Sequence, residues 1–177
     1  AHNVTWTNMA WVDGTDGWTN DDSGRKCLLV PARSKGVVSY NPLSDFKQAG
    51  KTIEIAYKVS NAADYNENII TIATNPTASN FKGIIIKPKK IIVHSNNLYM
   101  EDEKQSYPTK EDELMHVAIT IIRDYQGNRD YNICIIYVNG VKKCSFEFTS
   151  SDTFLGSNLI VGSETADLSI YKMRVYD

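Results

Sequence analysis

The sequence has few cysteines, no long hydrophobic run and no excess of basic residues. Its 177 residues include three cysteines, an odd and sparse set that does not form a disulfide framework. No apolar stretch approaches the ~18 residues that a membrane-spanning helix needs, so we expect no membrane insertion. The formal net charge is -2, which argues against a nucleic-acid partner, because such partners normally require a basic patch.

A recognisable catalytic motif is also missing. There is no Gly-x-Ser-x-Gly nucleophile turn, and the histidines at 2, 94 and 116 have no cysteine or carboxylate at metal-ligand spacing. Glycosidases on β-sheets need two carboxylates that project from one face, but Glu54 stands alone on its strand. The acidic clusters at 101–103 and 111–113 lie in polar segments beside lysines, as solvated surface residues do. We therefore expect a protein that is not an enzyme.

The length is that of one domain, and we expect a single domain over residues 1–177. Such a chain can bury a substantial core without disulfides or metals. The first residues lack a basic region followed by an apolar one, so we expect no signal peptide in this stretch.

Short, alternating, β-branched segments separated by turn residues run through the whole sequence. Residues 51–59 alternate most clearly, with Ile53, Ile55 and Tyr57 on one face, as in a half-buried antiparallel strand. Asn139-Gly140 separates two such segments and predicts a type I′ hairpin. Residues 101–113 are charged and turn-like, with room for one helical turn at 109–113. Short strands are expected at residues 4–7, 26–31, 36–40, 51–59, 68–74, 83–87, 91–94, 98–100, 114–123, 131–138, 142–148, 158–162 and 168–176. This pattern predicts an all-β sandwich or barrel.

The predicted Asn139-Gly140 hairpin also indicates whether Cys134 and Cys144 can form a disulfide. With Val138 opposite Val141 in a two-residue turn, Ile135 would face Cys144, so Cys134 and Cys144 would point to opposite faces of the sheet. We therefore expect free thiols.

The C-terminal half resembles the laminin G-like and concanavalin A-like jelly rolls. The resemblance depends on an ordered set of segments at residues 114–120, 135–140, 159–162 and 168–176, which read LMHVAIT, IIYVNG, LIVG and LSIYKMRVY. Residues 51–55 resemble an N-terminal strand of the family, so the likeness covers about two-thirds of the chain. Leu114 or Met115 stands where members often have tryptophan. The resemblance implies an antiparallel jelly-roll β-sandwich.

That family includes lectins, carbohydrate-binding modules, glycoside hydrolases, and adhesion or structural modules of viral and cell-surface proteins, so its fold alone does not give a function. Sugar sites combine an aromatic face, which packs on sugar C–H groups, with side chains that hydrogen-bond the hydroxyls. The best single stretch is residues 11–18, with Trp18 ranked above Trp11 because Trp18 lies among turn formers. The alternative is that one or both tryptophans fill an end of the sandwich. The candidate sugar-binding residues are Trp18, Trp11, Asp16, Asn20, Tyr65, Asn66, Tyr125 and Asn128.

The same loop offers carboxylates for a structural calcium ion, which many relatives hold. Calcium prefers six to eight oxygen ligands, whereas Asp-Gly pairs are also plain turn formers. The candidate ligands are Asp13, Asp16, Asp21 and Asp22.

The function that we expect is a non-catalytic, lectin-like module that recognises a polysaccharide or cell-surface glycan, without a cofactor other than possible calcium. The alternative is a structural or adhesion module of a larger surface or viral-particle protein, in contact with neighbouring domains. Either function predicts an extracellular or particle-surface location.

Overall fold

The computed structural model describes residues 4–7, 17–39, 51–74, 82–94, 104–126, 129–148 and 158–176, and every regular element among them is a β-strand. This part of the chain contains no helix long and apolar enough to cross a membrane. The strands are β1 (Val4–Thr7), β2 (Trp18–Asn20), β3 (Lys26–Val30), β4 (Ser34–Ser39), β5 (Lys51–Ser60), β6 (Ile70–Thr74), β7 (Lys82–Lys87), β8 (Lys90–His94), β9 (Lys104–Pro108), β10 (Met115–Gln126), β11 (Arg129–Val138), β12 (Val141–Phe148), β13 (Asn158–Ser163) and β14 (Asp167–Tyr176).

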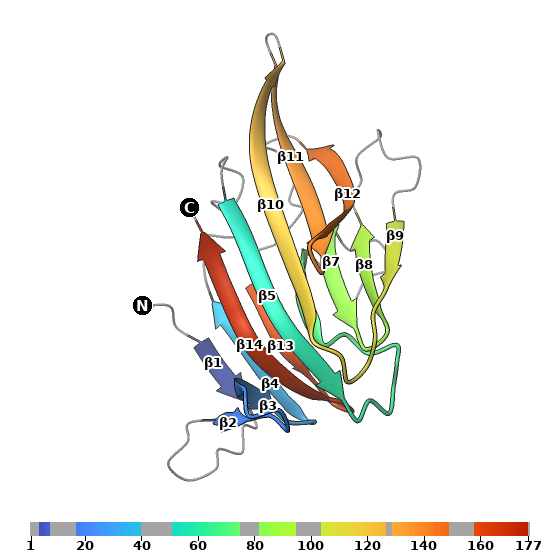
Figure 1. Ribbon diagram of the computed structural model, residues 1–177. Coiled ribbons are helices and arrows are strands. Elements are labelled where there is room, and N and C mark those ends of the chain that lie inside the picture. Colours follow the sequence, from blue (N-terminus) through green and yellow to red (C-terminus); the bar gives the residue numbers. More distant parts are fainter. Residues whose placement is uncertain are drawn as a thin grey trace.

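The strands form two seven-stranded antiparallel sheets that pack face to face (Figure 1). Sheet A has the order β1-β4-β13-β6-β7-β8-β9, and sheet B has the order β12-β11-β10-β5-β14-β3-β2. Each sheet combines strands that follow one another in sequence with strands that are distant in it, as in a jelly roll; β5, for example, lies between β10 and β14. This architecture confirms the predicted all-β jelly-roll sandwich.

The core lies between the sheets, and β5 shows how the sequence determines it. Ile53, Ile55, Tyr57 and Val59 are each at most 2% exposed, as the alternation predicted. Sheet A contributes alternating isoleucine and valine side chains from β6, β7 and β8 to the same cluster. Because successive side chains in a strand point to opposite faces, the residues between the buried ones, including Glu54, lie on the outer face of sheet B.

Several local predictions of secondary structure were wrong. Trp18–Asn20 forms a short strand where a loop was expected, because the turn after it brings this polar segment alongside β3. Lys104–Pro108 is an edge strand paired with β8, although its polar sequence lacks alternation; edge strands are commonly polar. Residues 111–113 form turns, with Asp112 at a φ of 61°, in place of a helical turn. The strand expected at 98–100 lies outside the described residues.

The Asn139-Gly140 hairpin has the expected turn but a different register. Both turn residues have positive φ, at 50° and 77°, as a type I′ turn requires. A bulge after Ile136 then places that residue opposite Cys144. Cys134 therefore lies on the same inner face as Cys144, and the prediction of opposite faces was wrong because a bulge adds a residue to one strand. All three cysteines are buried free thiols.

Native protein should leave its cysteines unmodified by a thiol reagent, whereas denatured, unreduced protein should show all three thiols. Burial raises the pKa of both Cys134 and Cys144, so the reactive thiolate is suppressed as long as the fold persists. A count of one thiol after denaturation would contradict the structure.

Gly162 allows β13 and β4 to approach closely, and its replacement should destabilise the fold. Its φ is 115°, and an added Cβ would overlap the carbonyl oxygen of Ser34 and lie 2.9 Å from the Cα of Lys35. Gly162→Ala should lower the free energy of unfolding by about 2–5 kcal/mol through strain and overpacking. Gly24→Ala is the control: it also has positive φ but has open space around it, so it should cost about 1–2 kcal/mol. Equal losses in denaturant titrations of the two variants would contradict this account.

Candidate functional site

Trp18 lies on β2, an edge strand of sheet B, with 45% of its surface exposed. In the pairing of β2 with β3, Trp18 is opposite Leu28, and Asn20 is opposite Lys26. The ammonium group of Lys26 lies 5.7 Å from the centroid of the indole ring, within cation–π range. Asn20 and Lys26 are both exposed. The hairpin therefore presents an aromatic ring beside an amide and an ammonium group.

Asp21 holds the turn that joins β2 to β3. Its side chain is 3% exposed and accepts hydrogen bonds from the backbone N–H groups of Ser23 (2.9 Å) and Arg25 (2.8 Å) and from Nε of Arg25 (3.0 Å). The Tyr171 hydroxyl on β14 donates a further bond of 2.7 Å to Oδ2. Burial raises the pKa of Asp21, but the hydrogen bonds from Tyr171, Arg25 and Ser23 outweigh it and bring the pKa to about 2. Asp21 therefore fixes the hairpin that carries Trp18 against the sheet.

The calcium hypothesis is only partly covered by the described residues. Asp13 and Asp16 lie outside them, Asp22 is exposed, and both oxygens of Asp21 accept hydrogen bonds from the protein. Among the described residues, no three His, Cys, Asp or Glu side chains gather as a metal site would require. Calcium in this loop stays a prediction, and Asp21 has a structural role that does not depend on it.

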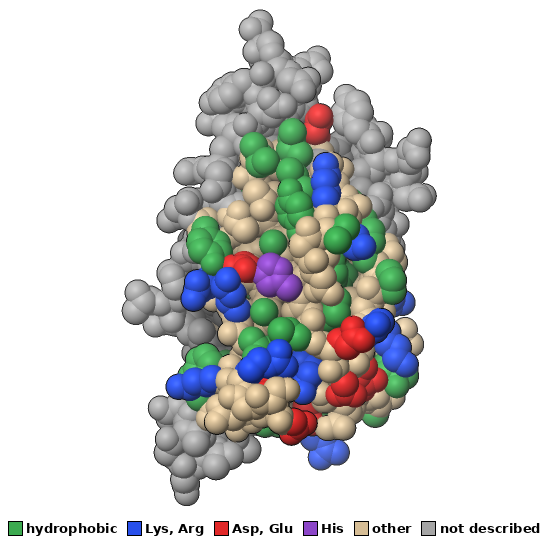
Figure 2. All heavy atoms as spheres, viewed as in Figure 1, with side chains coloured by type: hydrophobic (Ala, Val, Ile, Leu, Met, Phe, Trp, Pro, Cys, Tyr) green, Lys and Arg blue, Asp and Glu red, His purple; other side chains and the backbone are tan. Residues whose placement is uncertain are grey.

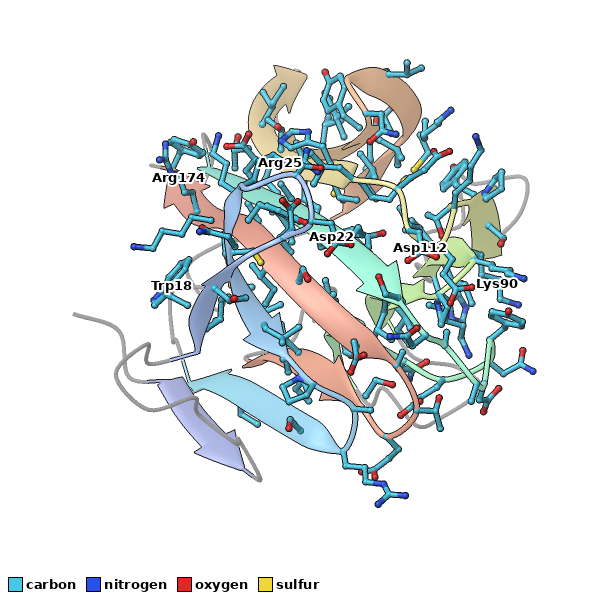
Figure 3. The ribbon with its side chains drawn as sticks, turned by 60° about the horizontal axis from the view of Figure 1, so that its bottom comes forward. Trp18, Asp22, Arg25, Lys90, Asp112 and Arg174 are labelled. Carbon is cyan, nitrogen blue, oxygen red and sulfur yellow. The ribbon has the colours of Figure 1, made fainter. Side chains whose placement is uncertain are left out.

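Two other predicted sugar-binding residues lie far from the Trp18 hairpin. Tyr65 and Asn66 are exposed in the loop between β5 and β6, and the Lys89 ammonium lies 3.5 Å from the centroid of the Tyr65 ring. Figure 3 shows Lys90, the next residue, on the opposite side of the molecule from Trp18. The described candidates therefore form two separate surfaces. The other candidates lie outside the described side chains: Trp11, Asp16, Tyr125 and Asn128.

A polar cluster that sequence reasoning missed lies on the outer face of sheet B. Glu54, whose side chain is 16% exposed, accepts a hydrogen bond from Lys172 (2.7 Å) and one from the Tyr176 hydroxyl (2.6 Å) at Oε2. Its Oε1 lies 2.6 Å from Nε2 of His116. The hydrogen bond from Lys172 and, after it, the one from Tyr176 lower the pKa of Glu54 to about 2. The bond between Lys172 and Glu54 also raises the pKa of Lys172. Both carboxylate oxygens are therefore engaged by the protein.

The strand alternation already placed Glu54 on the outer face, but it did not indicate its partners. His116 is 62 residues away in sequence, and strand pairing brings it beside Glu54. A bulge between Ile170 and Lys172 shifts the register of β14 against β5. Register and bulges of this kind depend on the whole sheet, so the sequence carried no local signal for this cluster.

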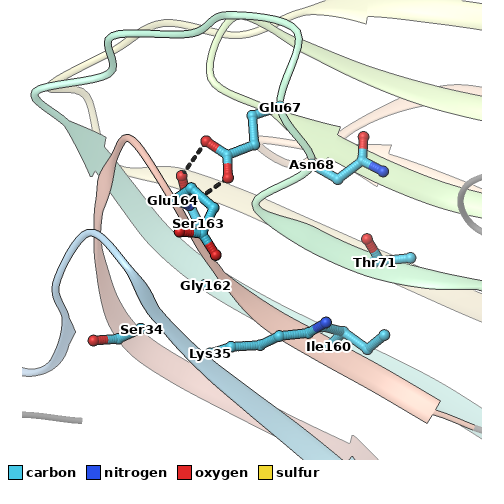
Figure 4. A pocket seen from close by; sticks show the side chains of 9 residues that line it. All are labelled: Ser34, Lys35, Glu67, Asn68, Thr71, Ile160, Gly162, Ser163 and Glu164. Atoms are coloured by element: carbon cyan, nitrogen blue, oxygen red, sulfur yellow. Dashed lines mark hydrogen bonds between the residues drawn. The ribbon is translucent and has the colours of Figure 1, made fainter. Parts of the chain in front are cut away.

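A pocket of about 210 Å³ lies on sheet A, between β4, β6 and β13 (Figure 4). On one wall, the Glu67 carboxylate accepts hydrogen bonds from Ser163 Oγ (2.7 Å), Thr165 Oγ1 (2.7 Å) and the backbone N–H of Glu164. Burial raises the pKa of Glu67, but these hydrogen bonds lower it more. The same bonds hold the β13–β14 turn against the β5–β6 loop. The pocket has no aromatic side chain in its lining. The lining residues are Ser34, Lys35, Glu67, Asn68, Thr71, Ile160, Gly162, Ser163 and Glu164.

Solved structures of several kinds share this jelly-roll sandwich, whereas no family model and no curated protein matches the chain. The receptor-binding domain of botulinum neurotoxin mosaic serotype C/D is 15% identical with a TM-score of 0.58, and the match covers 99% of this chain and 42% of that one. The carbohydrate esterase vb_24B_21 from Shiga toxin-encoding bacteriophage phi24B is 16% identical with a TM-score of 0.55, over 97% and 88% of the two chains. The alginate lyase AlyC3 is 12% identical with a TM-score of 0.53, over 90% and 78%. This chain thus spans less than half of the toxin domain, and likeness at these identities shows the fold alone.

Acid should weaken the fold between about pH 4.5 and pH 2, and Asp21→Asn with Glu54→Gln should reduce this dependence. Both carboxyl groups have a folded-state pKa of about 2, below their ordinary values of 3.8 and 4.5. Their stabilising contribution is therefore complete above the ordinary pKa values and is lost as the pH falls through about 2. Melting temperatures from pH 7 to pH 2 measure this effect. Asp22→Asn, which removes an exposed carboxylate from the same turn, is the control and should keep the wild-type dependence of melting temperature on pH. If the variant with both Asp21→Asn and Glu54→Gln also keeps that dependence, the stabilising role of these two carboxylates is contradicted.

Proposed function

We propose that this chain is a non-catalytic glycan-binding module of laminin G-like type, which uses Trp18 as its stacking platform. The observation that carries the proposal is the exposure of this indole, 45%, on a hairpin that Asp21 holds in place. A large aromatic side chain left open to solvent on a rigid support is typical of a binding surface.

The surroundings of Trp18 suit a sugar ring. The indole face can pack on sugar C–H groups, while Asn20 offers an amide and Lys26 an ammonium group for the hydroxyls. The Asp21 hydrogen bonds order the turn before any ligand arrives, which lowers the entropic cost of binding. The pocket on sheet A is a weaker candidate, because its lining has no aromatic platform.

Solved structures of the same fold support a glycan as the ligand. One botulinum neurotoxin DC binding domain of this fold was solved in complex with SialylT, and cell entry of type C toxin depends on interaction with two ganglioside molecules. A glycan ligand would also fit a location outside the cell or on a particle surface, beside neighbouring domains of a larger protein.

The carboxylates support a non-catalytic role. A general acid at neutral pH needs a pKa raised towards 7. The hydrogen bonds at Asp21, Glu54 and Glu67 lower the pKa of each, in the opposite direction. These groups act as structural acceptors.

Trp18→Ala should weaken glycan binding by at least about tenfold, because aromatic anchors dominate such contacts. It should cost less than about 2 kcal/mol of stability, whereas a buried tryptophan would cost about 3–5 kcal/mol. Affinity gels or calorimetry across a broad glycan panel, together with melting curves, measure both effects.

Tyr65→Ala is the matched control, because Tyr65 is 42% exposed and also lies under a lysine. It should retain wild-type binding; loss in this variant alone would move the site to the β5–β6 loop. If wild-type protein binds nothing across the panel, the proposal fails, and a structural or adhesion module becomes the better account.

A further inference from the structure

Within the described residues, the Glu54 cluster leaves an arginine without a partner on the outer face of sheet B. Arg174 on β14 is the register partner of Glu54 on β5, so the two would be expected to form an ion pair. Lys172, Tyr176 and His116 instead occupy both oxygens of Glu54. Arg174 is exposed and, within the described part of the chain, has neither a hydrogen bond nor an ion pair through its side chain.

Further basic side chains lie on the same side of the molecule. Lys58 lies two residues beyond Ala56 on β5 and so shares the face of Lys172, which pairs with Ala56. Arg25 is 48% exposed and its guanidinium lies 5.2 Å from the centroid of the Tyr171 ring. Figure 2 shows this face, with basic side chains beside and below the histidine, and Figure 3 shows Arg25 and Arg174 on the same side of the sandwich.

The two carboxylates in direct contact with these basic groups do not compete for a ligand. Asp21 and Glu54 are each saturated by hydrogen bonds from the protein and are largely shielded from solvent, at 3% and 16% exposure. The chain as a whole carries a net charge of -2, so basic groups gathered on one face form a local feature that its composition does not predict. A face of this kind attracts anions.

We propose that the face formed by Arg174, Lys172 and Arg25 binds the anionic groups, carboxylate or sulfate, of an acidic glycan. The inference rests on the proposed glycan-binding function and adds the class of glycan. Arg174 is the principal contact, because a guanidinium presents two parallel N–H donors to a carboxylate or sulfate. None of its donors is in use among the residues that the structure describes. Lys172 has further N–H donors besides the one directed at Glu54.

Aromatic side chains favour a sugar over a simple anion. Tyr176, 40% exposed, adjoins the cluster through its hydrogen bond to Glu54 and can pack against a ring. Trp18 lies two strands away from β14, about 10 Å at ordinary strand spacing. Its register partner Leu28 packs against the core, so the indole projects from the face of sheet B opposite to the Glu54 cluster, at the edge that Figure 3 shows. A ligand that reaches both surfaces must be an extended chain that passes around the β2 edge of sheet B.

The test compares glycans that differ in charge and share a backbone. Polygalacturonate is compared with its methyl ester, and dextran sulfate with dextran, so that each pair separates charge from sugar and the two pairs separate carboxylate from sulfate. Wild-type protein should prefer the charged member of at least one pair. Arg174→Gln should weaken binding of that member by about tenfold or more and leave the neutral member unchanged. Arg174→Lys should fall between the two, and Lys90→Gln, which removes a charge on the opposite side, should have no effect.

The outcomes separate this inference from the proposed function. Equal binding of charged and neutral members by the wild type, or wild-type binding by Arg174→Gln, overturns the acidic-glycan inference; the glycan-binding function then stands if Trp18→Ala still reduces binding. Binding of no glycan at all overturns both. Tight binding of polyglutamate that is lost in Arg174→Gln would assign the face to an acidic peptide and overturn the inference. Melting curves should match the wild type for all three variants, because the Arg174 and Lys90 side chains make no hydrogen bond or ion pair among the described residues.

Discussion

The packing of the β5 isoleucines between the two sheets is the constraint on which the rest of the structure depends. Ile53 and Ile55 are almost fully buried, and at about 1.5–3 kcal/mol for each such side chain they make a one-residue slip of the strand prohibitive. The same alternation places Glu54 on the outer face. The position of the polar cluster is therefore a consequence of core packing, because no register can bury the isoleucines and also turn Glu54 inward.

Three carboxylates then connect strands and turns through contacts that lie outside the core. Asp21 joins the β2–β3 turn to β14, Glu54 joins β5 to β10 and β14, and Glu67 joins the β5–β6 loop to the β13–β14 turn. Each accepts several hydrogen bonds and has a lowered pKa, so each acts as a fixed acceptor at neutral pH. Their effect on function is indirect: Asp21 orders the Trp18 hairpin, and Glu54 engages Lys172 and leaves Arg174 exposed to solvent.

The sequence predicted the parts of the fold that have a local physical signal. Alternation identified β5, and the need for positive φ identified the Asn139-Gly140 turn. It failed where pairing decides the structure: β2 and β9 are polar strands formed by their neighbours, and the bulge after Ile136 moved Cys144 by one position. The same limit applies to the candidate site. Turn residues around Trp18 favoured exposure, and the indole is exposed, whereas the Glu54 cluster depends on strands that are far apart in sequence.

The most direct test of the central claim is an NMR titration of the protein with an oligosaccharide that it retains, followed at the indole N–H signals. The chain has three tryptophans, so three signals are expected, and Trp18→Phe identifies one of them. The account predicts that the Trp18 signal shifts in a saturable way, together with the backbone signals of β2 and β3. Shifts confined to the β5–β6 loop or to the sheet A pocket, with the Trp18 signal unmoved at saturation, would contradict it.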